Sequence, residues 1–363
     1  MRVALVTASL DPAQGGPSRN VPRLAEALRQ AGVEAQVHAP EAGTSGLARR
    51  IGRSPELERR LLASGVNLIH AHGLWMMPLG YACRAAREGA VPLIISPRGM
   101  LAPWALRRSR WKKALAQRFL HPGAFERASG WHATSKKEAD DIRRQGFRQP
   151  VCVAPNGIDP PTERSEDVRS TYERLAPEMA GRRVLLFYSR FHSKKRIAEL
   201  IRDFALLAER RAAWHLLVVG IPGEYSVEQL RAHASACGVS GRVSIHDGRG
   251  LPPPYGVAEL MALPTHDENF AQVVVESLVR GVPVLTTTGT PWEDLPVVGA
   301  GGWVDIERFT DELGQWMGKP TSELRIAGER GRSWALARFT WESVAAELVA
   351  FYRALIQAAA LAS

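Results

Sequence analysis

The stretch Pro264–Pro283 has the sequence PTHDENFAQVVVESLVRGVP and carries two glutamates, Glu268 and Glu276, eight positions apart. A polar loop that follows the apolar run Leu260–Pro264 ends in the first carboxylate, and the second lies inside a predicted apolar helix. On a helix the two would be roughly 12 Å apart along the axis, so they could not share one proton or one metal ion. They would suit two separated hydroxyl groups of one extended ligand. The alternative is that Asp267 or Glu268 only caps the helix.

Short apolar runs alternate with helical stretches along the whole chain. The strand-like runs are Arg2–Ala8, Glu34–His38, Leu68–His72, Leu93–Ser96, Gly130–Ala133, Val151–Ala154, Val184–Ser189, His215–Gly220, Val243–His246, Leu260–Pro264 and Val284–Thr287. The predicted helices include Asn20–Gln30, Gly80–Glu88, Arg196–Arg210, Val227–Cys237 and Ala271–Arg280. This alternation predicts an α/β fold with parallel sheets, whose ligands bind at the carboxyl ends of the strands.

The chain has 363 residues, which is more than one ordinary domain contains and predicts two. The turn dipeptide Asn156-Gly157 follows a strand-like run, so we place the boundary there. The expected parts are residues 1–160, residues 161–339 and a final helical segment, 340–363. The apolar residues of that helix share one stripe, so it must pack against another element; they are Val344, Leu348, Phe351, Leu355 and Ile356.

The composition favours a globular protein with an anionic partner. The net charge of +10 suits nucleotide phosphates, nucleic acid or an anionic membrane, or is only a basic surface. The three cysteines are far apart in the sequence, which argues against a disulfide framework or a zinc site. The apolar run Val3–Ser9 is too short for a signal peptide, and no stretch reaches the roughly 18 apolar residues of a membrane span. We therefore expect a cytoplasmic protein.

Cations are concentrated in Phe187–Arg196, FYSRFHSKKR, after the strand that opens the second domain. Arg190 can hold phosphate oxygens in bidentate fashion, and Lys195 can act as a point charge. The segment therefore predicts a phosphate site, with a solvated basic helix start as the alternative.

Two further places offer backbone N–H groups to an anion. The amides of Asn269, Phe270 and Ala271 are predicted to open a helix, where unpaired N–H groups attract phosphate. Gly15 and Gly16 follow the first strand, in QGGPS. This segment is neither a GxGxxG motif nor a P-loop, so nicotinamide binding and ATP hydrolysis lose their usual support. A purely structural turn remains the alternative for these glycines.

Two strand ends in the first domain carry His70, His72 and Arg98. A His-x-His pair suits metal binding, but no third ligand with a recognisable spacing follows, and a core histidine is the alternative. The chain also contains no Asp-x-Asp motif, the usual carboxylate clamp for a metal-bound diphosphate. We therefore expect no metal ion.

Aromatic and basic residues alternate in Trp104–Phe119, WALRRSRWKKALAQRF. This pattern is typical of an interfacial helix that binds anionic lipid. Contact with nucleic acid and a solvated helix face are the alternatives.

Taken together, in their order and spacing, these residues resemble the family 4 glycosyltransferases. These are retaining enzymes of the GT-B architecture, in which two Rossmann-like domains with parallel sheets face a central cleft. The resemblance covers nearly the whole chain; the matching segments are Gly15-Gly16, Ser96–Leu101, His132–Glu138, Pro155–Asp159, Arg190–Lys195, Glu268–Glu276 and Gly281–Trp292. The elements SPRGML and GTPW are similar to those of bacterial members that build surface polysaccharides.

The resemblance implies a role for each group of residues. Glu276 would hold the ribose hydroxyls, and Glu268 the donor sugar. The complete donor-binding set would be Gly15, Gly16, Arg190, Lys195, His246, Gly248, Arg249, Glu268, Asn269, Phe270, Ala271 and Glu276, in which Arg190, Lys195 and Glu268 are catalytic. The acceptor would lie near His72, Arg98, Trp104, Thr134 and Ser135. The final helix would cross back onto the first domain.

The implied activity is transfer of a hexose from a GDP- or UDP-linked donor to a glycan or lipid-linked glycan, in bacterial polysaccharide or glycolipid synthesis. No cofactor or metal ion and no nucleic acid would take part. The protein would be cytoplasmic, with segment 104–119 against the inner face of the membrane. The alternatives are a GT-B phosphorylase, a sugar-nucleotide epimerase, or a non-catalytic basic protein that binds membrane or nucleic acid.

The chain departs from the family pattern at three positions. Ala271 and Arg196 stand where members often have glycine, and Arg98 occupies the region where many carry a histidine beside the reacting carbon. The third departure puts the catalytic role of that position in doubt, since an arginine there could instead hold an anionic acceptor or a phosphate.

Overall fold

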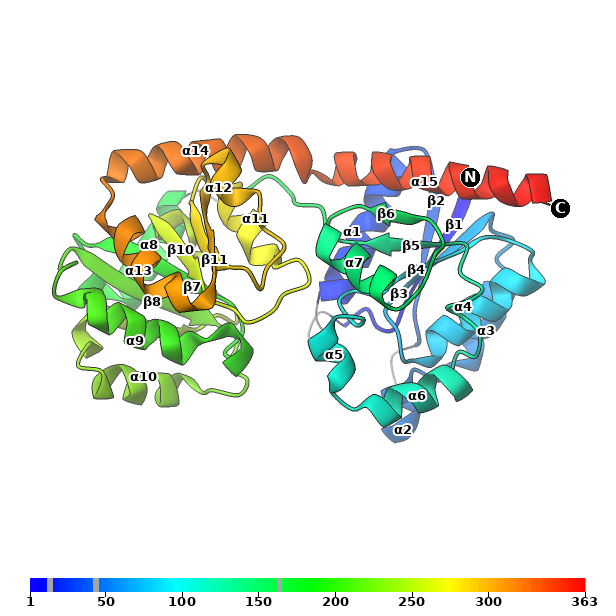
Figure 1. Cartoon of the computed structure of the whole chain (residues 1–363), viewed down its shortest axis with the longest axis horizontal. Coiled ribbons are helices and arrows are strands. Elements are labelled where there is room, and N and C mark those ends of the chain that lie inside the picture. Colours follow the sequence, from blue (N-terminus) through cyan, green and yellow to red (C-terminus); the bar gives the residue numbers. More distant parts are fainter. Residues whose placement is uncertain (12–15, 42–45, 162–164, 363) are drawn as a thin grey trace. The chain divides into compact units, whose positions relative to one another are not determined.

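The computed structural model describes residues 1–11, 16–41, 46–161 and 165–362, and the chain divides into two compact units. The first consists of Met1–Gly157 with Phe339–Ser363, and the second of Ile158–Arg338. Each unit has its own parallel sheet with helices around it, as Figure 1 shows. The expected α/β fold with parallel sheets is therefore confirmed.

The first unit contains a six-stranded sheet in the order β2-β1-β3-β4-β5-β6. Its strands are β1 (Arg2–Thr7), β2 (Glu34–His38), β3 (Leu68–His72), β4 (Leu93–Ser96), β5 (Gly130–Ala133) and β6 (Val151–Val153). Its helices are α1 (Gly16–Gln30), α2 (Gly46–Ile51), α3 (Pro55–Leu62), α4 (Met77–Glu88), α5 (Pro103–Arg107), α6 (Arg110–Phe119), α7 (Lys136–Arg144) and α15 (Trp341–Ala362).

The central strands of this sheet, β1, β3, β4 and β5, are buried on both faces, which is why they are mostly apolar. In β1, Ala4 and Val6 belong to the hydrophobic cluster that includes α3 and α4, while Val3 and Leu5 belong to the cluster with α1 and α15. Residues that alternate along a strand point to opposite faces, so each set covers one helical layer.

Helix α15, the last of the chain, packs within the first unit. Its stripe Val344, Leu348 and Tyr352 is buried in the same cluster as α1. The part Trp341–Leu361 has a mean hydropathy of 1.5, is one third buried, and is long and apolar enough to cross a membrane by length and composition alone. Its buried stripe is that of a core helix in this structure.

The second unit contains a six-stranded sheet in the order β12-β11-β10-β7-β8-β9. Its strands are β7 (Arg183–Tyr188), β8 (Trp214–Gly220), β9 (Val243–Asp247), β10 (Leu260–Leu263), β11 (Val284–Thr287) and β12 (Gly301–Val304). Its helices are α8 (Ser165–Leu175), α9 (Ile197–Ala208), α10 (Val227–Ala236), α11 (Gln272–Leu278), α12 (Leu295–Val298), α13 (Phe309–Gly318) and α14 (Thr321–Arg338).

Five elements of the second unit were not among those predicted: strand β12 and helices α8, α12, α13 and α14. Strand β12 begins with Gly301 and Gly302, which have low strand propensity, so its pattern was weak. Helix α14 buries mainly small residues and therefore shows no broad apolar stripe. A side chain at its Gly328 would lie 1.8 Å from the carbonyl oxygen of Gly281, so this helix approaches its neighbour closely only because glycine is present.

The order of strands creates one topological switch point in each sheet. In the first unit the chain passes from β1 to β2 on one side and later to β3 on the other. In the second it passes from β7 to β8 and β9 on one side and to β10, β11 and β12 on the other. Loops that leave neighbouring strands in opposite directions open a crevice at the carboxyl edge, and this is where open α/β sheets bind ligands.

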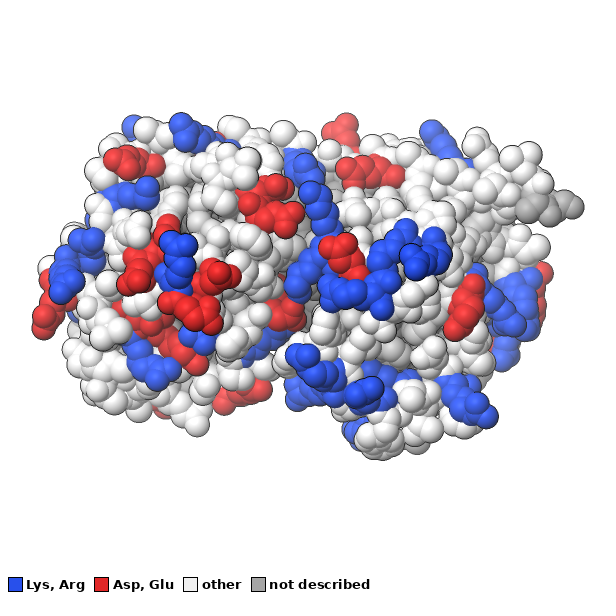
Figure 2. Space-filling view, in the orientation of Figure 1, with Lys and Arg blue, Asp and Glu red and all other residues white. Residues whose placement is uncertain are grey.

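The positive charge is concentrated on parts of the surface. Figure 2 shows Lys and Arg side chains gathered over the region of the first unit that Figure 1 labels α5 and α6. Part of the net charge of +10 is therefore concentrated in this segment.

Candidate functional site

The switch point of the second sheet brings Lys195 and Glu268 together. Lys195 lies in the 3-10 turn Ser193–Lys195 after β7, and Glu268 lies in the loop after β10. The Lys195 Nζ forms an ion pair with the Glu268 Oε1, and the two side chains are only 13% and 12% exposed. The Thr265 hydroxyl donates a hydrogen bond of 2.9 Å to the same oxygen. The two strongest candidates of the sequence are thus direct partners in a largely desolvated place.

A second ion pair joins the same two loops. Lys194 Nζ lies 3.1 Å from Asp267 Oδ2, and the His266 amide donates to the Lys194 carbonyl over 2.9 Å. Because both cations are paired with carboxylates of the other loop, the loops after β7 and β10 are fixed relative to each other.

The reading of Asp267 or Glu268 as a helix cap is wrong. Helix α11 begins at Gln272, and its N-cap residue is Ala271, which makes no side-chain cap hydrogen bond. The predicted helix Ala271–Arg280 therefore starts one residue too early, and the amides of Asn269 and Phe270 do not open it. Asn269 and Phe270 belong to the preceding loop, where the Phe270 carbonyl accepts a 2.6 Å hydrogen bond from the Trp292 indole.

Glu276 lies in α11 and is oriented by a residue that the sequence did not reveal. The Tyr255 hydroxyl donates a 2.8 Å hydrogen bond to Glu276 Oε2. Burial, and secondly Glu276 itself, raises the Tyr255 pKa well above its usual value, so this phenol keeps its proton. Nothing in the sequence links residues 21 positions apart in this way, because the contact is tertiary.

The remaining donor-side candidates of the second unit lie around the same edge of the sheet. Arg190 follows β7 and is exposed. His246 lies in β9, and burial lowers its pKa, with Arg231 as a smaller cause. Gly248 follows β9, where a Cβ would lie 3.2 Å from Val219 Cγ1. The Arg249 guanidinium donates to the Asp247 carboxylate, with its Nε 2.9 Å from Oδ2.

The three departures from the family pattern share a backbone conformation. Arg98, Arg196 and Ala271 have φ angles of 55°, 55° and 60°, in the left-handed region. Glycine adopts this region without the clash that a Cβ causes, and the clash costs about 1–2 kcal/mol. The left-handed backbone thus explains why family members often have glycine at the positions of Arg196 and Ala271. This chain keeps the same backbone conformation without glycine.

In the first unit, the loops after β3 and β4 bring His72 and Arg98 together. Arg98 Nη2 donates to His72 Nδ1 over 3.0 Å, and its Nη1 donates to Asn156 Oδ1 over 2.7 Å. Burial lowers the Arg98 pKa to about 10, with Glu138 and Tyr352 opposing that shift. Arg98 thus remains a cation at pH 7 in a mainly neutral environment.

Thr134 and Ser135 surround a buried carboxylate. Glu138 Oε2 accepts hydrogen bonds from the Thr134 amide and hydroxyl at 2.7 and 2.8 Å, and its Oε1 accepts from the Gly99 amide at 2.5 Å. The Ser135 hydroxyl caps α7 by accepting from the Glu138 amide at 3.2 Å. These acceptor-side candidates therefore form the internal support of the loop that carries Arg98.

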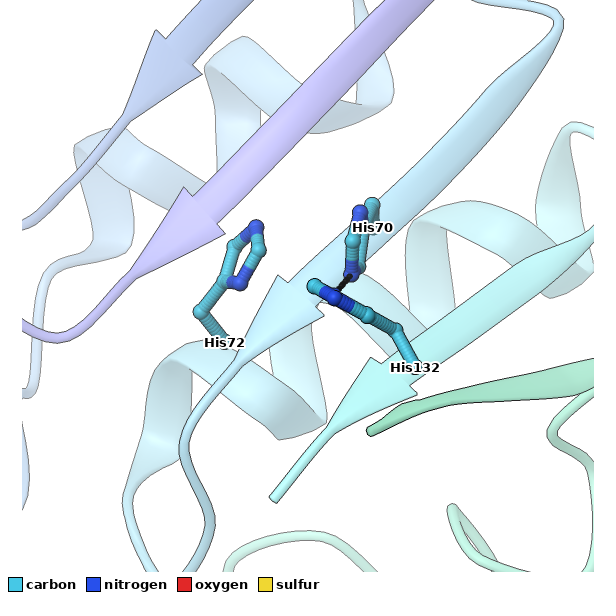
Figure 3. A group of neighbouring side chains, drawn as sticks. All are labelled: His70, His72 and His132. Carbon is cyan, nitrogen blue, oxygen red and sulfur yellow. Dashed lines mark hydrogen bonds between the residues drawn. The ribbon is translucent and has the colours of Figure 1, made fainter. Parts of the chain in front are cut away.

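The structure adds a third histidine to the pair found in the sequence. Figure 3 shows His70 and His72 on one strand and His132 on another, joined to His70 by a hydrogen bond of 3.2 Å between His132 Nδ1 and His70 Nε2. All three are buried, and their possible ligand atoms lie within 4.8 Å of one another. No sequence spacing could have revealed this group, because β4 separates the two strands in the sheet.

The remaining candidates are Trp104, Gly16 and Gly15. Trp104 lies in α5, is 40% exposed and has the Arg108 guanidinium 5.7 Å from its ring centre. Gly16 begins α1, with no atom within 4 Å of an added Cβ. Gly15 lies outside the described residues.

Family comparisons account for most of the chain. Residues 15–157 match the family described as "Glycosyl transferase 4-like domain", and residues 172–304 match "Glycosyl transferases group 1". These two matches fall within the first and second units. The chain therefore belongs to the family 4 glycosyltransferases.

Two curated relatives have related sequences. A D-inositol 3-phosphate glycosyltransferase of Segniliparus rotundus is 30% identical over 59% of this chain and 49% of the relative. A GDP-mannose:cellobiosyl-diphosphopolyprenol alpha-mannosyltransferase of Komagataeibacter xylinus is 25% identical over 70% of this chain and 67% of the relative. The chain thus spans about half of the first relative and two thirds of the second.

A solved structure has the same fold. Anabaena HepE in complex with UDP matches 98% of this chain and 100% of its own, with a TM-score of 0.74 and 18% identity. The GT-B fold expected from the sequence is confirmed by this likeness.

The left-handed conformation of Ala271 predicts that glycine is better at this position. We expect Ala271→Gly to raise the free energy of unfolding of the second unit by up to about 1 kcal/mol, because relief of the Cβ clash outweighs the greater entropy of the unfolded chain. Urea denaturation measures the change. Ala232→Gly, in the exposed interior of α10, is the control and should cost about 1 kcal/mol. A destabilised Ala271→Gly variant would contradict the argument.

The buried histidines predict a first unit that loses stability in mild acid. Burial lowers the pKa of His70 and His72 well below 6.5 and that of His132 to about 3. Between these values and 6.5 the unfolded chain binds more protons, so stability present above pH 6.5 is lost as the pH falls. From pH 7.5 to about 5.5 we expect a loss of about 1 kcal/mol for each ring.

Hydrogen exchange of the β3 and β5 amides measures this loss in the first unit alone. His132→Gln should weaken the pH dependence, whereas His233→Gln in the second unit is the control for the substitution itself. An unchanged pH dependence in His132→Gln would show that these rings do not cause it.

Proposed function

We propose that the chain is a retaining glycosyltransferase that moves a hexose from a GDP- or UDP-linked donor to a glycan or lipid-linked glycan. The observation that carries the proposal is the Lys195–Glu268 pair at the switch point of the second sheet. Family membership supports the reaction class. The UDP complex of HepE and the GDP-mannose and lipid-linked acceptor in the mannosyltransferase's name support the donor and acceptor classes.

The positions of the two glutamates suit the two ends of such a donor. Glu268 projects from a loop at the strand edge and Glu276 from the helix that follows, so each carboxylate can accept from hydroxyl groups at a different place. Glu276 is already oriented by Tyr255, which leaves little of its rotamer entropy to lose on binding. In this proposal Glu268 binds the sugar and Glu276 the ribose.

Cations between these ends would stabilise the leaving group. Cleavage of a sugar–phosphate bond places negative charge on the departing diphosphate, and fixed positive charge there lowers the barrier. Arg190 is exposed after β7, and Lys195 lies in the same loop. We propose that these two residues replace a metal ion in this role, and that the departing phosphate takes the acceptor proton, with retention of configuration.

Single substitutions separate binding from transfer. Glu276→Ala should weaken nucleotide binding, while Arg190→Ala and Lys195→Ala should lower turnover by about 10² or more, because each removes charge that the transition state needs. Calorimetry with UDP and GDP measures the first effect and release of nucleoside diphosphate the second.

The matched controls are Glu209→Ala and Arg210→Ala, exposed residues just after α9, which should leave both quantities unchanged. Normal turnover in the Arg190 and Lys195 variants would contradict the proposal. Conversion of the donor to an isomeric sugar nucleotide without acceptor would indicate an epimerase instead.

We further propose that α5 and α6 place the first unit against an anionic membrane, at the cytoplasmic face where a lipid-linked acceptor would lie. The residues Trp111, Leu115 and Phe119 are spaced four apart on one side of α6 and are 65%, 46% and 67% exposed. Within α6 only Ala116 is buried, so this stripe is not part of the core.

Charge accompanies the apolar stripe. Segment 104–119 contains six cations, Arg107, Arg108, Arg110, Lys112, Lys113 and Arg118, and no acidic residue. Lys112 and Arg118 lie 5.4 and 5.8 Å from the ring centres of Trp111 and Phe119, so charge flanks the stripe. Aromatic rings beside cations are typical of helices at an anionic interface.

Vesicle sedimentation tests this surface. The protein should bind vesicles with anionic lipid and not zwitterionic ones, and Trp111→Ser with Phe119→Ser should lower binding by about tenfold or more, because apolar burial is lost. Lys112→Glu should act in the same direction. Leu206→Ser, at a 75% exposed position of α9, is the control. Equal binding to both kinds of vesicle, or binding to RNA in preference to anionic vesicles, would contradict the assignment.

A further inference from the structure

Arg98 is a partly buried cation at the carboxyl edge of the first sheet, and no carboxylate that the structure describes is bonded to it. Among the described residues its hydrogen-bond partners are a neutral amide, Asn156, and an imidazole, His72. The nearby carboxylate, Glu138, attracts it only through space, since both Glu138 oxygens already accept hydrogen bonds from Gly99 and Thr134.

A chain of hydrogen bonds determines the protonation of two histidines beside it. The Ala154 carbonyl accepts at 2.8 Å from His132 Nε2, so His132 Nδ1 is the acceptor for His70 Nε2–H. His70 Nδ1 then accepts from the Tyr352 hydroxyl at 2.7 Å. Every ring nitrogen of His70 and His132 is thus engaged, and both rings are neutral.

His72 differs from these two rings, because one of its ring nitrogens is a donor without an acceptor in the described part of the chain. A guanidinium can only donate, so His72 Nδ1 accepts from Arg98 and the proton of His72 lies on Nε2. Among the described residues, this buried Nε2 has no hydrogen-bond partner, nor has the buried Nε of Arg98. The hydroxyl of Ser96, a residue of the adjacent β4, is also buried without a partner there.

One ligand could pair with all of these groups. A buried donor without an acceptor is unfavourable, and a partly buried cation without an anion is more so. One oxygen-rich anion would supply acceptors for the donors and a charge for Arg98. The residues lie at the ends of β3 and β4, beside the β1–β3 switch point, where an α/β sheet binds ligands.

We infer that Arg98 and His72 form a binding site for a phosphate group carried by the acceptor. That the ligand is the acceptor rests on the proposed function, whereas the existence of an anion site is argued from residues of the first unit alone. A phosphate suits the place because its oxygens can accept from Arg98, His72 and Ser96 in different directions. A metal ion does not suit it, because the lone pairs of His70 and His132 are engaged and Arg98 repels a cation.

Calorimetry with the full chain and inorganic phosphate, at constant ionic strength against chloride, tests the inference. Arg98→Gln should raise the dissociation constant by about tenfold or more, because a charge-assisted bond is lost. A hexose phosphate should compete with phosphate, and the neutral hexose should not. Arg87→Gln, an exposed arginine of α4, is the control and should bind as the parent chain does.

Asn156→Asp tests the same site without removal of the arginine. Its carboxylate would replace the amide oxygen that lies 2.7 Å from Arg98 Nη1 and so supply an anion from within the protein. We expect phosphate binding to weaken by about tenfold while the thermal midpoint does not fall. This variant keeps the inference testable if Arg98→Gln fails to fold.

Four results would overturn the inference. Three are phosphate affinity independent of both substitutions, UDP affinity lost in parallel with phosphate affinity, and stoichiometric zinc that His132→Gln removes. The fourth is UDP binding with no phosphate binding, which would contradict this inference but not the proposed donor site of the second unit. Absence of both UDP and GDP binding would instead remove the proposed function.

Discussion

The ion pair between Lys195 and Glu268 is the interaction on which the candidate site of the second unit depends. β7 and β10 pair in the sheet, but beyond the strand ends their loops leave it in opposite directions at the topological switch point. The pair joins them, and its low exposure makes each charge costly without the other. A donor diphosphate would approach a lysine that is already positioned, with Glu268 beside it for a sugar hydroxyl.

Neutral hydrogen-bonded side chains connect the strand ends of the first unit, whereas ion pairs connect the loops of the second. Tyr352, on the last helix, begins a hydrogen-bond chain through His70 and His132 to the carbonyl of Ala154. Tyr352, which packs in the core of the first unit, thus also determines which ring nitrogens of His70 and His132 carry the proton. Burial lowers the pKa values of these rings, so Arg98 is left as the charged group beside them.

The sequence predicted the fold well because both sheets are parallel and their central strands are buried on both faces. Such strands are short apolar runs, and the helices between them carry stripes, so most elements could be found one at a time. β12 and α14 were missed because they depend on glycines and small residues, whose role is close approach to a neighbour. The start of α11 was placed one residue too early because Ala271 adopts a left-handed conformation, which an alanine in the sequence does not reveal.

The sequence by itself determined the α/β class, the family and the residues that gather at the strand ends, because periodicity and motif spacing are local properties. The tertiary structure alone decided which of those residues meet. It paired Lys195 with Glu268, oriented Glu276 through Tyr255, and brought His132 to His70 across the sheet. It also left Arg98 without a bonded carboxylate, since the Glu138 oxygens accept from backbone and hydroxyl donors instead. Contacts of this kind join distant segments, and their burial sets protonation and charge in ways that no linear pattern records.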